Sequence, residues 1–117
     1  MHTSKSTEGG QIVEVHKKTE LDKLEDYLID KRITYERFDE DEERDESGRI
    51  LKCDRHQICV PEDGEGCRWD AICQRGSYGH EKGLLEIYGE LIVEEDGDSV
   101  KGYLTADDVI KRIEAKK

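Results

Sequence analysis

The sequence has few apolar residues and no long apolar run. Apolar side chains make up 33% of its 117 residues, whereas 42% of the residues are charged. No stretch approaches the roughly 18 apolar residues that cross a membrane as a helix. The first residues also lack the apolar segment of a secretory signal. We therefore expect a cytoplasmic protein with a small core, solvated loops and no membrane contact.

Basic residues are outnumbered by acidic ones. The chain carries 30 Asp and Glu against 19 Lys and Arg, a formal net charge of −11. A field of this sign repels nucleic acid and acidic membranes at long range, so direct binding to nucleic acid is disfavoured. The remaining charge-driven partners are a basic protein surface and a cationic ligand. Simple solubility is an equally good explanation of the charge.

The negative charge is concentrated in one run, residues 39–46, which supplies −6 of the total. Its acidic members are Asp39, Glu40, Asp41, Glu42, Glu43, Asp45 and Glu46. Repulsion at this density predicts a solvated loop, with bounds at 39–48. Alternatively, the run and a second acidic segment, 94–98, form a carboxylate surface that mimics a phosphate backbone. Such a surface would bind the basic groove of a nucleic-acid-binding protein.

Local patterns predict the elements on either side of this run. Residues 1–10 have no apolar pattern and are expected to be a disordered tail. Thr19 is a helix N-cap, followed by apolar residues at helical spacing. Thr105 and Asp108 have the spacing of a capping box that opens a last helix. The expected strands are 11–16 and 33–38, then two segments within 49–60, and finally 67–74 and 100–104.

The segment from Cys67 to Gly89 contains the only Trp and the longest apolar pattern of helical period. We expect a strand to Gln74, a glycine-rich turn at 75–79, and a helix from His80 to Ile92. Pairing of 58–60 with 67–69 across the loop after Pro61 would place Cys59 near Cys67. Together these elements predict an α+β domain over 11–117, with a small, mainly antiparallel sheet covered on one face by two to three helices.

Two motifs carry a resemblance to known proteins. WDAIC-x-RGSYG-x-x-x-GLLEIYG (69–89) and GYLTADDVIKRIE (102–114) resemble a group of small proteins encoded by phages and prophages of gut Clostridia. The resemblance implies no activity and no catalytic residues. It implies a context, because small accessory phage proteins often act by binding host proteins, including inhibitors of host defence.

The turn at 75–80 is the first candidate for chemistry. A nucleophile elbow needs Gly two residues before the Ser, and Arg75 occupies that position ahead of Ser77. The turn could instead hold an anion through its free N–H groups and Arg75. A plain helix-entry turn capped by Ser77 is the structural alternative. We include Arg75, Ser77, Tyr78 and His80 as candidate partner contacts.

The four cysteines are the second candidate. In a reducing compartment they are free thiols, buried residues or metal ligands. Cys53, His56, Cys59 and Cys67 supply the residue types and some of the short spacings of a zinc site. Cys73 and His80 could also form a thiolate–imidazole pair, although no third, orienting group is identifiable.

No complete set of nucleophile, base and orienting group is present in these patterns. The sequence therefore favours a non-enzymatic acidic binding protein that binds and inhibits a host protein. The alternative is a small module that binds a metal or an anionic ligand, through the zinc set or the 75–80 turn. The sequence does not predict an oligomeric state.

Overall fold

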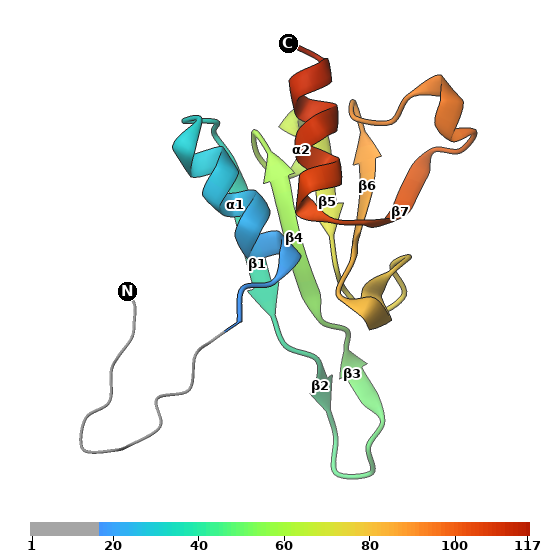
Figure 1. The fold of residues 1–117 in the computed structure, drawn as a ribbon. Helices are drawn as coiled ribbons and strands as arrows, with labels where there is room; N and C mark the ends of the chain where they lie inside the picture. Colours follow the sequence, from blue (N-terminus) through green and yellow to red (C-terminus); the bar gives the residue numbers. More distant parts are fainter. Residues whose placement is uncertain (1–16) are drawn as a thin grey trace, which may run out of the picture.

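The framework of the protein is an antiparallel sheet with two helices packed on it. A computed structural model describes residues 17–117 (Figure 1). Its elements are α1 (Glu20–Asp30), β1 (Glu36–Glu40), β2 (Glu43–Arg44), β3 (Ile50–Lys52), β4 (Arg55–Val60), η1 (Gly64–Gly66), β5 (Trp69–Ile72), η2 (His80–Lys82), β6 (Leu85–Gly89), η3 (Glu94–Asp96), β7 (Val100–Leu104) and α2 (Ala106–Ala115). The five-stranded sheet has the order β1-β4-β5-β6-β7, and β2 pairs with β3. The fold is α+β, as the sequence predicts.

Helix α1 begins at the cap that the sequence predicts. The Thr19 hydroxyl accepts a hydrogen bond from the Asp22 N–H at 3.1 Å, and the Asp22 carboxylate accepts one from the Thr19 N–H at 2.9 Å. This exchange satisfies two donors that a helix start leaves without partners. Leu21, Leu24 and Leu28 fall on one face of the helix and are buried.

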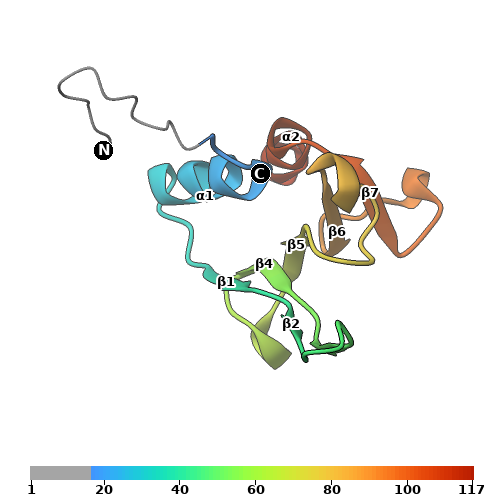
Figure 2. The same ribbon diagram turned by 90° about the horizontal axis from the view of Figure 1, so that it is seen from below.

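Helix α2 begins with the same exchange, between Thr105 and Asp108. The two helix starts are also joined to each other. The Glu20 carboxylate accepts a hydrogen bond from the Ala106 N–H at 2.7 Å, so the first turn of α1 helps to cap α2. Figure 2 shows both helices on the same side of the sheet.

The core lies between the helices and one face of the sheet. The inward-pointing residues of β4, β5 and β6 alternate along each strand, and they include Ile58, Ala71 and Ile87, which are fully buried. The remaining alternate positions point to the opposite side, which neither α1 nor α2 covers. We call that side the uncovered face. Among residues 17–117, no helix combines the length and the apolar character that a membrane crossing requires.

The predicted helix from His80 to Ile92 is wrong. Only the 3-10 turn η2 forms at its start, and Leu85–Gly89 is strand β6. Gly79 and Gly83 have φ angles of 98° and 71°, in the left-handed region, which an α-helix does not contain. The segment LLEIY satisfies a period of two as well as a helical period, and the sheet selects the former.

The other strand predictions differ less from the structure. β7 has the predicted bounds, and the hairpin of β4 with β5 is confirmed, with Val60 opposite Trp69. β1 begins at Glu36, three residues later than expected. The structure also places strand residues inside 39–48, which the sequence predicts as a loop. The tail at 1–10 and the strand at 11–16 lie outside the described residues.

Replacing Leu24 by Ala should lower the free energy of unfolding by about 2–5 kcal/mol, because the side chain is completely buried and its loss leaves a cavity. Ile29→Ala is the matched control on the same helix, since the Ile29 side chain is 59% exposed. It should change stability by no more than about 0.5 kcal/mol. Urea unfolding followed by circular dichroism measures both variants. Equal losses would contradict the assignment of the buried face.

Candidate partner-binding surface

The acidic run forms part of a projecting hairpin, residues 39–52, which we call the acidic arm. It contains the end of β1, then β2 and β3, and it extends beyond the main sheet (Figure 1). Glu43 lies opposite Lys52 in the pairing of β2 with β3. The carboxylate of Asp45 closes the tip by accepting hydrogen bonds from the Ser47 N–H at 2.8 Å and the Arg49 N–H at 3.0 Å. These bonds, together with one from the Ser47 hydroxyl, lower the pKa of Asp45.

Several carboxylates of the arm are neutralised from within the chain. Asp39 pairs with Arg37 at 2.8 Å and with His56 at 2.9 Å, and Glu40 pairs with Lys52 at 3.3 Å. These contacts explain why the run folds instead of remaining a repelling loop.

Three acidic side chains of the arm have neither an ion-pair partner nor a hydrogen bond within residues 17–117: Asp41, Glu43 and Glu46. All three are exposed. Leu51, on the same hairpin, is 62% exposed. The arm therefore presents both free carboxylates and an exposed apolar side chain.

The glycine-rich turn at 75–80 is a structural turn. The Ser77 hydroxyl accepts a hydrogen bond from the Gln74 N–H at 3.0 Å and donates one to the Gln74 carbonyl at 2.7 Å, and Ser77 is buried. The turn leads into η2 and β6, so it is not the entry of an α-helix. Both hydrogen bonds of the hydroxyl are made within the turn. The turn therefore accounts for a Ser at this position without a nucleophilic role.

Two N–H groups of this turn are bound to carboxylates of the chain. The Arg75 N–H donates to Asp54 at 3.0 Å, and the Tyr78 N–H donates to Glu86 at 2.7 Å. The Arg75 guanidinium pairs with Glu42 of the arm at 3.2 Å. Two backbone donors of the turn and the Arg75 guanidinium are thus occupied by Asp54, Glu86 and Glu42, and the anion-binding alternative gains no support from the geometry.

The contact between Glu42 and Arg75 joins the two predicted partner contacts, the arm and the turn. Between them is a hollow of about 330 Å³. Its walls are Asp41, Glu42, Asp54, His56, Arg75 and His80. The second acidic segment, 94–98, lies at the other end of the strands, in the connection between β6 and β7 (Figure 1). The single carboxylate surface that would include both acidic segments is therefore wrong.

The four residues of the proposed zinc set are not arranged around one point. His56 and Cys59 are three positions apart on β4, so they lie on opposite faces of the sheet. His56 is opposite Asp39 on the helix side, and Cys59 is opposite Asp70 on the uncovered face. Among the described residues, no group of three or more His, Cys, Asp or Glu is placed to hold a metal ion.

Cys59 and Cys67 are neighbours, as the predicted hairpin requires. Burial, with nearby Cys67 and Asp63, raises the pKa of Cys59 to about 12. Burial and Asp70 raise the pKa of Cys67 as well. Both side chains are therefore protonated thiols at neutral pH, and neither is a ready metal ligand or nucleophile.

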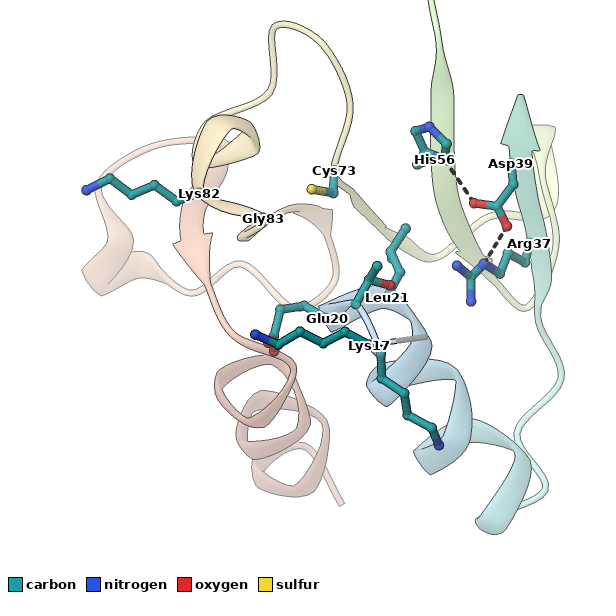
Figure 3. A pocket seen from close by; sticks show the side chains of 11 residues that line it. Lys17, Glu20, Leu21, Arg37, Asp39, His56, Cys73, Lys82 and Gly83 are labelled. Atoms are coloured by element: carbon teal, nitrogen blue, oxygen red, sulfur yellow. Dashed lines mark hydrogen bonds and ion pairs between the residues drawn. The ribbon is translucent and has the colours of Figure 1, made fainter. Parts of the chain in front are cut away.

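A larger hollow, of about 500 Å³, lies between the start of α1 and the helix-facing side of the sheet (Figure 3). Its walls include Arg37, Asp39, His56 and Cys73. A thiol beside an Asp–His pair suggests nucleophilic catalysis. However, Figure 3 shows the Cys73 sulfur pointing toward Gly83 and away from the His56 ring. Burial and the nearby Asp54 carboxylate also raise the pKa of Cys73. Within residues 17–117, no hydrogen bond joins Cys73 to His80, which lines the other hollow.

Comparison of the chain with protein-family models, curated proteins and solved structures finds no match. The resemblance to phage proteins therefore stays a prediction. Sequence reasoning also did not single out Asp70, Glu86 and Tyr88, which lie together on the uncovered face. The alternation of side chains along β5 and β6 is the sequence signal that places these three residues together. The sequence hides this signal because the segment of β6 also fits a helical period.

The cysteines should react with iodoacetamide in the order of their exposure. Cys53 is exposed and should be modified first, whereas Cys59 is buried, has a raised pKa and should be modified last. Mass spectrometry of quenched time points at pH 8 measures each site, with denatured protein as the control in which all four react. Protection of Cys53 that a chelator removes would contradict this order and restore the zinc alternative.

Proposed function

We propose that this protein is a non-enzymatic binding protein whose acidic arm engages a basic surface on another protein. The observation that carries the proposal is the set of free carboxylates, Asp41, Glu43 and Glu46, on a formed hairpin that also exposes Leu51. A formed hairpin loses less conformational entropy on binding than a loop does. Its charges steer a basic partner toward it, and the apolar side chain adds contact area.

The rest of the surface supports a binding role. The arm is joined to the 75–80 turn through Glu42 and Arg75, so a partner seated on the arm would also reach His80 of that turn. The Tyr78 side chain is 56% exposed. Aromatic side chains of this kind often contribute strongly to interfaces. The groups that would suggest catalysis, Ser77 and Cys73, are respectively committed to a turn and held as a thiol.

The identity of the partner rests on charge and on the resemblance alone. A net charge of −11 with a projecting row of carboxylates suits a basic groove, such as one that normally holds nucleic acid. The resemblance to phage and prophage proteins suggests that the groove belongs to a host protein, such as a defence protein. Binding there would block the groove, which makes inhibition the expected outcome.

The test neutralises the three free carboxylates of the arm by the substitutions Asp41→Asn, Glu43→Gln and Glu46→Gln. The matched control, Glu62→Gln with Glu65→Gln and Glu95→Gln, removes the same charge from exposed residues at the opposite end of the strands. Each protein is immobilised, exposed to a host lysate, and washed at 0.1 and 1 M salt. The wild type and the control should retain one basic protein at low salt only, because the Debye length falls from about 10 to about 3 Å.

The arm variant should lose that protein while keeping the wild-type unfolding curve. Retention by the arm variant at the level of the control would overturn the role of the arm. Purification of the captured protein then allows a direct measurement of the dissociation constant with all three chains. Equal dissociation constants would likewise contradict the proposal.

A further inference from the structure

The uncovered face has a charged and aromatic centre. In β5, Asp70 lies directly opposite Tyr88 of β6 and Cys59 of β4. Glu86 precedes Tyr88 by two residues on β6 and lies opposite Ile72 of β5. Alternation of side chains along the strands places this group on the side away from both helices. Two carboxylates, Asp70 and Glu86, therefore lie close together at the middle of a five-stranded sheet.

Neither carboxylate has a cation beside it within residues 17–117. Asp70 accepts a hydrogen bond from the Gln57 side chain at 2.7 Å, and Glu86 accepts the Tyr78 N–H at 2.7 Å. Both donors are neutral. Burial raises the pKa of Asp70, and the charges of Glu86 and Asp63 raise it further, although the Gln57 hydrogen bond lowers it.

Arg55 is a basic side chain on this face, and its contact with Asp70 is indirect, because its Nε donates to the Gln57 side-chain oxygen at 2.7 Å. The guanidinium of Arg55 stacks on the Phe38 ring at 3.8 Å and pairs with Asp63 at 3.2 Å. By contrast, Asp96 is held by both guanidinium nitrogens of Arg112 at 2.8 Å. The chain thus supplies cations to other carboxylates and leaves the pair on the uncovered face without one. A desolvated carboxylate without a counterion lowers stability, and such groups concentrate at binding sites.

An exposed tyrosine lies across the strand pair from Asp70, and the backbone of a second tyrosine contacts Glu86. The Tyr88 side chain is 57% exposed and adjoins Asp70 across the strand pair. Tyr78 is 56% exposed, and its own N–H is the donor to Glu86. Carboxylates flanked by aromatic rings fit a guanidinium, because it pairs with the former and stacks on the latter.

We propose that the uncovered face binds an arginine side chain of a protein partner, with the guanidinium between Asp70 and Glu86 and stacked against Tyr88. Arginine suits this geometry better than lysine, because its planar fork can donate to both carboxylates at once. A second copy of this chain is disfavoured, since it would bring a net charge of −11 and its own Asp70 to the same surface. This site is separate from the acidic arm and does not depend on the proposed role of the arm.

The test titrates ¹⁵N-labelled protein with an unstructured peptide that contains two arginines in a glycine chain. The matched control peptide carries citrulline at both positions, which keeps the shape and removes the charge. The arginine peptide should cause saturable shifts at Gln57, Asp70, Glu86 and Tyr88, and the citrulline peptide should cause much smaller ones. Shifts confined to residues 39–52, or no saturable shift up to about 10 mM peptide, would overturn the proposal.

The variant Asp70→Asn should weaken peptide binding at this face by at least about fivefold, as expected for loss of one ion pair. Asn can still accept the hydrogen bond from Gln57, so the fold should persist. Asp98→Asn, an exposed site on the loop before β7, is the control and should bind like the wild type. Unchanged binding by the Asp70 variant would overturn the role of that carboxylate. The arm variant should keep the shifts on this face, so failure of one proposal is distinguishable from failure of the other.

The same variant should also be more stable than the wild type at pH 7. The folded-state pKa of Asp70 is raised, so ionisation of this group destabilises the fold at pH values above that pKa. The gain in stability from Asp70→Asn should shrink as the pH falls through the folded pKa toward about 3.9, the unfolded value. Urea unfolding of both proteins at several pH values measures this difference in the free energy of unfolding. Lower stability at pH 7 would show that Asp70 has a structural role and would overturn the proposal.

Discussion

The structure depends on the packing of two short helices against one face of the sheet. Apolar residues are so few in this chain that only one such layer can form. Leu24 and Leu28 of α1 and Val109 of α2 fill it, over Ile58 and Ile87 of the sheet. The opposite face has to remain in contact with solvent or with another molecule. Scarcity of apolar residues therefore decides where polar and aromatic groups can gather.

Ion pairs arrange the charged residues that lie outside the core. Arg37 pairs with Asp22 and Glu25 of α1 and with Asp39 of β1, and so links the helix to the edge of the sheet. Glu42 performs a similar role by linking the arm to Arg75. The internal pairs convert a repelling run of acids into a hairpin, and the carboxylates that remain free are confined to a few places. A net charge spread evenly would have produced neither a defined arm nor a carboxylate pair on the sheet.

Local sequence patterns predicted the parts of the fold that local forces determine. The caps at Thr19 and Thr105 fixed both helix starts, because a capping exchange involves only four consecutive residues. Strand β6 was missed, since LLEIY fits two periods and only the neighbouring strands decide between them. The adjacency of the arm and the turn is a non-local contact that no motif encodes. In contrast, the opposite faces of His56 and Cys59 could have been read from their odd spacing on a strand.

The hydrogen bond from Ala106 to Glu20 has a consequence for how the chain folds as it is synthesised. It joins residues 86 positions apart, and α1 packs directly beside α2. The leading helix is made long before the trailing one, so its apolar stripe lacks a large part of its cover until the last strand and α2 have been added. Such long-range closure slows folding and leaves apolar surface open meanwhile. The nascent chain should therefore have its greatest need of chaperone protection just before residues 106–115 become available.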